Sequence, residues 1–199
     1  MAESPEKLLQ DLEERLKKAE EQFNKPGFLQ NRGLSNEVGY YVFDYEPQLE
    51  LFVRKWISKT QSKYESLAYG FKILVFDLYD IIIDTLQEKG FLEKAIQLER
   101  KGFDKVVKAV ESTMQFNSKY SLIIRHIKER ITKDEIVLIT GIGKAFPLLR
   151  SHAVLNNLHQ VIDSVPVILF YPGKYSTQDL TIFGASIDGN YYRAFKLVD

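Results

Sequence analysis

The sequence has no cysteine among its 199 residues. The chain therefore has no disulfide, no thiolate metal ligand and no cysteine nucleophile. This absence is typical of a reducing compartment, and we expect a cytoplasmic location. Long apolar runs are missing as well. None approaches the roughly 18 residues that a membrane-spanning helix needs, and residues 1–23 are too charged for a signal peptide.

An excess of charge is also absent, because 27 basic side chains balance 27 acidic ones. Net charge therefore gives no reason to expect binding to DNA or to an anionic membrane, although a local basic patch is compatible with it. What the chain does have is 45% hydrophobic residues. That fraction is enough for one compact domain with a small helical appendage.

A helix is predicted to begin at Ser4 and Pro5, a capping hydroxyl followed by a proline suited to the first helical position. Apolar residues then recur at helical spacing, at Leu9, Leu12, Leu16, Ala19 and Phe23. This stripe would pack either on the rest of the chain or on a partner. Residues 24–36 have little periodicity and contain two glycines and a proline. We therefore predict a helix and linker in residues 1–33 and a core domain in residues 34–199.

The core alternates strand-like and helical segments. Residues 39–47, 71–80, 135–140 and 165–171 are predicted to be strands, and their near-continuous apolar runs indicate strands covered on both faces. Residues 79–133 and about 144–162 are predicted to be helical, with Gly90 and Gly102 ending successive helices. In residues 180–197, two strand-like runs flank Asp188 and Gly189, a hairpin signal.

These elements predict an α/β fold with an open, mostly parallel sheet of about five or six strands, helices on both faces and a C-terminal β-hairpin. The frame resembles that of P-loop NTPases and Rossmann folds, so its glycine turns were compared with their phosphate-binding motifs. The segment VLITGIGKAFPLLRSH, residues 137–152, comes closest.

Neither phosphate-binding motif is present in that segment. A Walker loop would need glycine at Leu138 and serine or threonine at Ala145, and a dinucleotide fingerprint would need glycine at Phe146. Gly141, Gly143 and Lys144 remain as a weaker anion-binding candidate at a helix start. The alternative is that the glycines only let the chain turn sharply, and no magnesium ligand follows them.

The segment after the turn is rich in polar residues. His152, Asn156 and His159 would share one helix face. The two histidines would lie roughly 10 Å apart along the helix, too far to share one metal ion. We therefore expect no metal site. This face either bonds to neighbouring loops or, together with Arg150, contacts a partner or an anion.

Carboxylates at two strand ends are candidates for acid–base chemistry. Asp44 and Asp77 each end a strand-like run, at the edge where open α/β sheets bind ligands. They would hold a cation or act as acid and base, or else cap the helices that follow. No serine lies in a nucleophile-elbow pattern. We expect no catalytic residue and no cofactor.

Aromatic residues gather in FYPGKY, residues 170–175, and NYYRAF, residues 190–195. Pro172 and Gly173 predict a turn that displays Lys174 and Tyr175 on a loop. Together with Tyr171 and Arg193, and with Tyr191 and Tyr192, these residues would stack on bases or anchor a protein interface. The neutral net charge favours a protein partner.

The segments YVFDYEP, FDLYD, TGIGKAFPLLRSHAVLNNLH, FYPGKY and NYYRAF, in this order, resemble the BrxB family of BREX (bacteriophage exclusion) systems. The resemblance runs from about Gly39 to the C-terminus. It implies a non-enzymatic adaptor or assembly subunit, encoded with a DNA methyltransferase, a large ATPase and a PglZ-like protein of alkaline-phosphatase type. The PglZ-like protein is the partner that the resemblance implies first. The resemblance brings no catalytic residues. The positions that match its motifs, and that it makes candidates for a binding site, are Arg150, Ser151, His152, Asn156, Asn157, His159, Tyr171, Gly173 and Tyr175.

Overall fold

The computed structural model describes residues 4–29, 39–116, 118, 120–149, 157–158, 162, 164–176, 180–182, 185–187 and 194–199. The chain forms two compact units. The first comprises residues 1–75, 132–139 and 163–199, and the second comprises residues 76–131 and 140–162. The predicted boundary at residue 33 lies outside the described residues.

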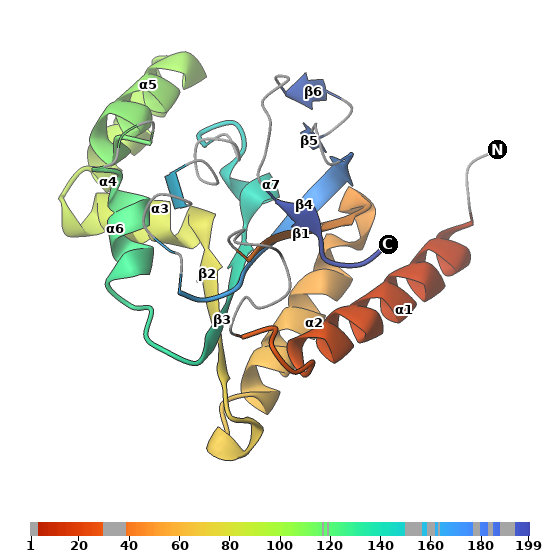
Figure 1. Ribbon diagram of the computed structural model, residues 1–199. Coiled ribbons are helices and arrows are strands. Elements are labelled where there is room, and N and C mark those ends of the chain that lie inside the picture. The colour runs from red at the N-terminus through yellow and green to blue at the C-terminus, as the bar shows by residue number, and fades with distance from the viewer. Residues whose placement is uncertain are drawn as a thin grey trace. The chain divides into compact units, whose positions relative to one another are not determined.

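A parallel sheet is the frame of the first unit (Figure 1). Its five strands follow the order β2-β3-β4-β1-β7, and β5 and β6 extend it from β4. The bounds are β1 Tyr40–Tyr45, β2 Lys72–Asp77, β3 Glu135–Thr140, β4 Val167–Tyr175, β5 Leu180–Ile182, β6 Ala185–Ile187 and β7 Phe195–Lys196. In the parallel pairs, Tyr40 lies opposite Val167 and Val137 opposite Val167. The predicted α/β class is confirmed.

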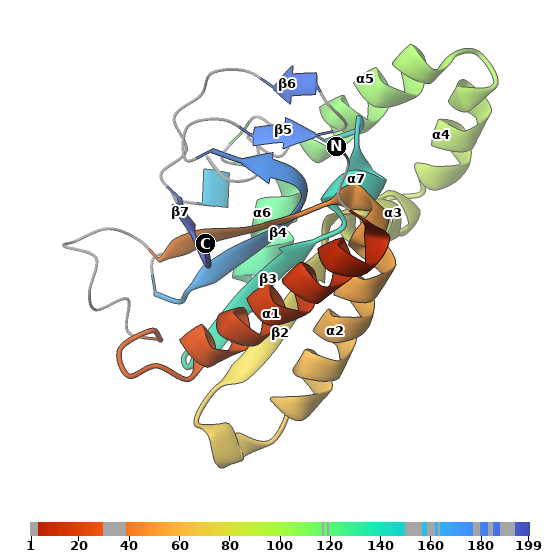
Figure 2. The same cartoon turned by 90° about the vertical axis from the view of Figure 1, so that its right-hand side faces the viewer.

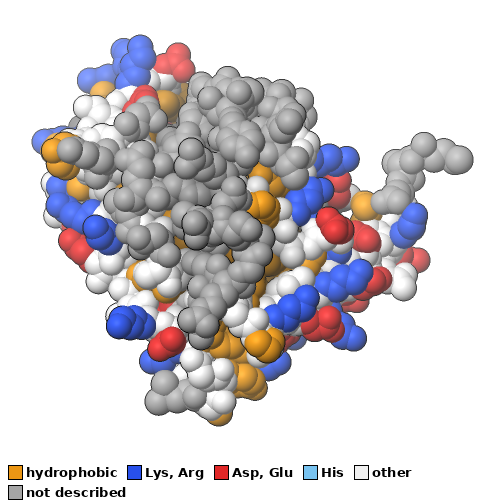
Figure 3. Space-filling model, in the orientation of Figure 1, with side chains coloured by type: hydrophobic (Ala, Val, Ile, Leu, Met, Phe, Trp, Pro, Cys, Tyr) orange, Lys and Arg blue, Asp and Glu red, His pale blue; other side chains and the backbone are white. Residues whose placement is uncertain are grey.

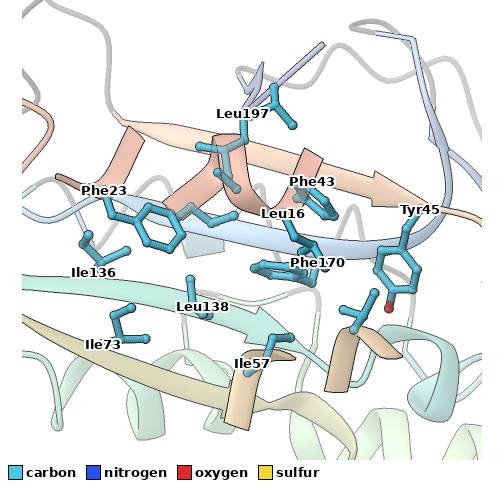
Figure 4. Close-up of a cluster of buried hydrophobic side chains, with 14 of the residues drawn as sticks. Leu16, Phe23, Phe43, Tyr45, Ile57, Ile73, Ile136, Leu138, Phe170 and Leu197 are labelled. Carbon is cyan, nitrogen blue, oxygen red and sulfur yellow. The ribbon is translucent and has the colours of Figure 1, made fainter. Parts of the chain in front are cut away.

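Two long helices of the first unit cover one face of this sheet. They are α1, Pro5–Phe23, and α2, Glu50–Lys63, which follows a short 3-10 turn η1, Pro47–Leu49; a second such turn, η2, spans Leu67–Tyr69. Side chains of both helices interleave with alternate residues of the strands (Figure 4), among them Leu16, Phe23, Phe43, Ile57 and Phe170. Each such burial contributes about 1.5–3 kcal/mol relative to exposure in water.

The predicted start of the N-terminal helix is confirmed. The Ser4 hydroxyl accepts a hydrogen bond from the Lys7 N–H at 3.3 Å, and Pro5 is the first helical residue. Leu12, Leu16, Ala19 and Phe23 are buried in the core of the first unit. The apolar stripe therefore packs on the chain's own sheet, while the exposed side of α1, at the right of Figure 3, carries acidic and basic side chains side by side.

The second unit is helical. It contains α3 Leu78–Glu88, α4 Leu92–Glu99, α5 Phe103–Met114, α6 Leu122–Lys128 and the four-residue α7 Ile142–Ala145 (Figure 2). Gly90 follows α3 and Gly102 follows α4 with positive φ angles of 67° and 127°. Both glycines lie where a helix must end and a left-handed conformation favours glycine, as the sequence indicated.

One predicted helix differs in the structure. The helix expected from Lys144 begins at Ile142 and ends at Ala145, because Phe146 precedes Pro147 and takes an extended ψ of 136°. Residues 146–148 form a turn and residue 149 a bend. Of residues 150–161 only 157 and 158 are described, and both are helical. Across the described residues, no helix is both long and apolar enough to cross a membrane.

The C-terminal region contains an antiparallel pair of strands. The antiparallel pair is β5 with β6, in which Ile182 lies opposite Ala185. Residues 188–190, which include the predicted Asp-Gly turn, lie outside the described residues, and β7 after them adds in parallel to β1.

Candidate functional site

The glycine turn of the second unit is closed by a carboxylate of the same unit. Gly141 has a φ of 75°, and a Cβ placed on it would lie 2.1 Å from Asp77 Oδ1. That carboxylate oxygen accepts hydrogen bonds from the Tyr79 and Asp80 N–H groups at 3.1 and 3.2 Å. Asp77 therefore caps α3, which is the capping alternative that the sequence left open.

Lys144 pairs with the carboxylates at the start of α3. Its Nζ lies 2.7 Å from Asp77 Oδ2 and 2.9 Å from Asp80 Oδ1, and 5.5 Å from the centre of the Tyr79 ring. Burial by itself would lower the pKa of Lys144, but the hydrogen bonds to Asp77 and Asp80 outweigh it and raise that pKa. Lys144 is therefore protonated, and the carboxylates of Asp77 and Asp80 balance its positive charge.

This geometry opposes an incoming phosphate. A phosphate at Gly141 would meet the Asp77 carboxylate, and like charges repel at such distances. The helix after the turn has only four residues, so its dipole adds little. Gly141 serves the close approach of Asp77, which accounts for its positive φ without a ligand.

The second place where such a frame holds ligands is the carboxyl edge of the sheet beside β1, in the first unit. There β2, β3 and β4 lie on one side of β1 and β7 on the other, so the strand order reverses at β1. Open α/β sheets bind their ligands at such a reversal. Asp44, near the end of β1, lies opposite Tyr171 of β4.

An internal ion pair fills that edge. Arg15 of α1 donates to Asp44 Oδ1 at 2.6 Å and to the Asp44 carbonyl oxygen at 2.9 Å. The other carboxylate oxygen accepts the Tyr175 N–H at 3.0 Å. Both side chains of the pair are mostly buried, at 18% and 14% exposed. Asp44 therefore neither caps a helix nor lies open to a substrate.

Arg15 was missed from the sequence, although the pattern carries a signal for it. It lies three residues after Leu12 and four before Ala19, hence on the same face of α1 as the buried stripe. A charged residue in an apolar stripe needs a buried partner. The partner could not be identified, because Asp44 is 29 residues away.

The tyrosine loop expected at residues 171–175 is wrong in its placement. β4 runs through Tyr175, and Tyr171 and Tyr175 are buried, at 0% and 2% exposed. The Tyr175 hydroxyl donates to the Ala194 carbonyl oxygen at 2.6 Å. These tyrosines are core residues and not displayed anchors. The strand continues because β5 pairs with it, Gly173 lying opposite Ile182.

Gly173 and Lys174 have different roles in that strand. A Cβ on Gly173 would lie 2.1 Å from the Thr181 carbonyl oxygen, so glycine is needed for β5 to come this close. Lys174 points to solvent, with its side chain 81% exposed and its Nζ 3.8 Å from Glu46. Of the four residues predicted here, only Lys174 is available to a partner.

The remaining candidates are mostly outside the described residues. This holds for Arg150, Ser151, His152, Asn156, His159 and Arg193, and for Tyr191 and Tyr192. Asn157 is described, and its side-chain amide donates to the Phe116 carbonyl oxygen at 2.9 Å within the second unit. Where the chain is described, no three His, Asp or Glu side chains gather in a way that would hold a metal ion.

Large apolar side chains exposed to solvent are a feature that the sequence interpretation did not single out. On α2 these are Leu51 and Phe52, and η2 adds Tyr69. In the second unit they are Phe91, Ile96, Phe103 and Tyr120. Helix α4 has no buried residue at all. Exposed apolar side chains that lie close together mark contacts with other molecules, whereas single ones are common on protein surfaces.

Comparison with known proteins gives one family. Residues 74–197 match the family described as BrxB, BREX protein BrxB. A protein of Bacillus cereus (strain H3081.97) named BREX protein BrxB is 40% identical over 189 residues, which are 94% of this chain and 98% of that protein.

A second protein of the same name, from Escherichia coli O9:H4 (strain HS), is 34% identical over 188 residues, which are 94% of this chain and 92% of that protein. No solved structure matches the chain. The family match spans more than half of the sequence, and both relatives align over nearly their whole length. The resemblance inferred from the motifs is confirmed, and the chain belongs to the BrxB family of BREX proteins.

Proposed function

We propose that this chain is a non-enzymatic adaptor or assembly subunit of a BREX complex, acting in the cytoplasm, and that its direct partner is the PglZ-like protein of alkaline-phosphatase type. Other components, the methyltransferase and the large ATPase, are further contacts of the same assembly. Membership of the BrxB family supports the assignment to BREX. The adaptor role is argued from the geometry.

One observation carries the proposal: each place where this frame would hold a phosphate contains a cation neutralised by the chain's own carboxylates. At the glycine turn this is Lys144 with Asp77 and Asp80, and at the reversal of strand order it is Arg15 with Asp44. Phosphate chemistry depends on uncompensated donors and positive charge. In this fold the donors and positive charges are already engaged by the chain's own side chains. Such a fold is better suited to binding partner proteins than to phosphate chemistry.

The test is co-purification with the PglZ-like protein encoded in the same operon, followed by size-exclusion chromatography with light scattering. We expect one peak, with the mass of a complex that contains a whole number of copies of each chain. Separate elution of the two proteins at micromolar concentration and modest salt would contradict the proposed partnership.

The same geometry makes a prediction about nucleotides. Because Lys144 is already paired with two carboxylates, we expect no saturable heat in calorimetry with ATP, GTP or nucleoside monophosphates up to millimolar concentration. The control is Lys144→Ala. Saturable binding by the wild-type chain that this variant loses would replace the adaptor role by that of a nucleotide or phosphate sensor.

A further inference from the structure

A continuous segment of the second unit has no buried residue. From Lys89 to Lys108, through all of α4 and the first half of α5, every residue is exposed or half-exposed. We call these residues, 89–108, the docking arm. Helices in folded proteins gain most of their stability by packing an apolar face. Helix α4 contacts α5 with Leu92, Ala95 and Leu98 half-exposed, but none of its residues is fully buried.

The docking arm displays three large apolar side chains. Phe91, Ile96 and Phe103 are 41%, 44% and 47% exposed. Phe91 directly precedes α4, Ile96 lies within it and Phe103 begins α5. The three residues are therefore distributed along α4, a helix of eight residues that is about 12 Å long. That span fits easily within one protein–protein contact, which takes about 20–30 residues from each side.

The docking arm is also basic, although the charges of the whole chain balance. Between residues 89 and 108 there are six basic side chains and three acidic ones. The six cations are exposed: Lys89, Lys94, Arg100, Lys101, Lys105 and Lys108. Figure 3 shows lysine and arginine side chains beside hydrophobic ones over α4 and α5, at its upper left.

None of the six cations forms an ion pair with another described residue. Lys94 lies 5.2 Å from the centre of the Phe91 ring. The docking arm therefore presents exposed apolar side chains together with a net charge of +3, from six cations and three carboxylates. Protein contacts combine apolar side chains at the centre with polar groups at the rim.

We propose that the docking arm binds a protein surface with apolar pockets surrounded by an excess of carboxylates. The inference rests on the proposed function, because the surface belongs to the direct partner of the adaptor. A second copy of this chain is a poor occupant, since a two-fold contact would place the same basic segment against itself. Nucleic acid would use the cations and leave Phe91, Ile96 and Phe103 exposed.

The experiment measures binding of the purified PglZ-like protein to three forms of the full chain. The first is the wild type. The second, Phe91→Ser/Ile96→Ser/Phe103→Ser, removes the apolar side chains of the docking arm. The third, Leu51→Ser/Phe52→Ser, removes two exposed apolar side chains of α2 and serves as the matched control. Circular dichroism and thermal unfolding check that all three are folded to the same extent.

We expect the docking-arm variant to bind at least about 100-fold more weakly than the wild type, because central apolar side chains carry most of the energy of a contact. The α2 control should bind within about threefold. A fourth form, the charge-reversal variant Lys94→Glu/Lys101→Glu/Lys105→Glu, keeps the apolar side chains. It should associate at least about tenfold more slowly at low salt, because the steering charge is reversed.

The outcomes are distinguishable. If the wild-type chain forms no complex, the proposed function fails and the docking surface fails with it. If the wild type binds and the docking-arm variant binds equally well, only the docking surface is overturned. Self-association of the wild type would show that the occupant is another copy of the chain. Retardation of duplex DNA that Lys94→Glu/Lys101→Glu/Lys105→Glu loses would show that it is nucleic acid. Either result would overturn the proposed protein surface.

Discussion

Replacing Gly141 by alanine is expected to lower the free energy of unfolding by about 3 kcal/mol. The left-handed φ of 75° costs a residue with a Cβ about 1–2 kcal/mol. The new methyl group would lie 2.1 Å from Asp77 Oδ1. It would force that side chain out of its capping position, at a further cost of about 1 kcal/mol. Urea denaturation followed by circular dichroism measures the change.

Gly90→Ala is the matched control for this prediction. Gly90 also lies in the second unit with a positive φ of 67°, but a Cβ there would meet nothing within 4 Å. It should cost only the backbone strain, about 1–2 kcal/mol. The double variant Asp77→Ala/Gly141→Ala should cost less than the sum of its single variants, since the clash is gone. If Gly141→Ala and Gly90→Ala lower the free energy of unfolding by the same amount, the close approach of Asp77 to Gly141 is contradicted.

Replacing Arg15 by alanine is expected to destabilise the chain by about 3 kcal/mol, because it leaves a mostly buried carboxylate without its counter-charge. Asp44 would keep one hydrogen bond, from the Tyr175 N–H, and its carbonyl oxygen would lose the Arg15 donor. The guanidinium also lies 5.0 Å from the centre of the Phe43 ring, and that contact is lost as well. Denaturant unfolding again measures the effect.

The control for the buried pair is an exposed pair of the same type. Arg54 donates to Glu50 at 2.7 Å on the surface of α2, and Arg54→Ala should cost less than about 1 kcal/mol. Adding Asp44→Asn to Arg15→Ala should restore part of the stability, because an amide needs no counter-charge. If Arg15→Ala and Arg54→Ala cost the same, the Arg15–Asp44 pair is not an important support of α1.

The predictions from the sequence agree best with the structure where the sequence signal is local. β3 spans Glu135–Thr140 as predicted, because a continuous apolar run between polar residues has few alternatives. Ser4 and Pro5 begin α1 for equally local reasons, a side chain and a ring that fit the first turn. Family membership was also readable from the chain, since long motifs survive in order.

The predictions from the sequence differ most from the structure at the candidate site. The glycines after β3 indicated a turn, but the charge that fills it comes from Asp77, 67 positions from Lys144 in the printed sequence. The Pro172–Gly173 pair indicated a loop, but pairing with β5 kept Tyr175 in a strand and buried it. Turn signals describe the bonds of a few residues, and a neighbouring strand can outweigh them.

The sequence by itself determined the α/β class, the start of α1, the course of β3 and the BrxB family, because each depends on residues close together in the chain. Tertiary structure alone decided that Lys144 and Arg15 are neutralised, that Tyr171 and Tyr175 are buried, and that the docking arm is left uncovered. The physical reason is that ion pairing and burial depend on which distant residues folding brings together. No local pattern contains that information.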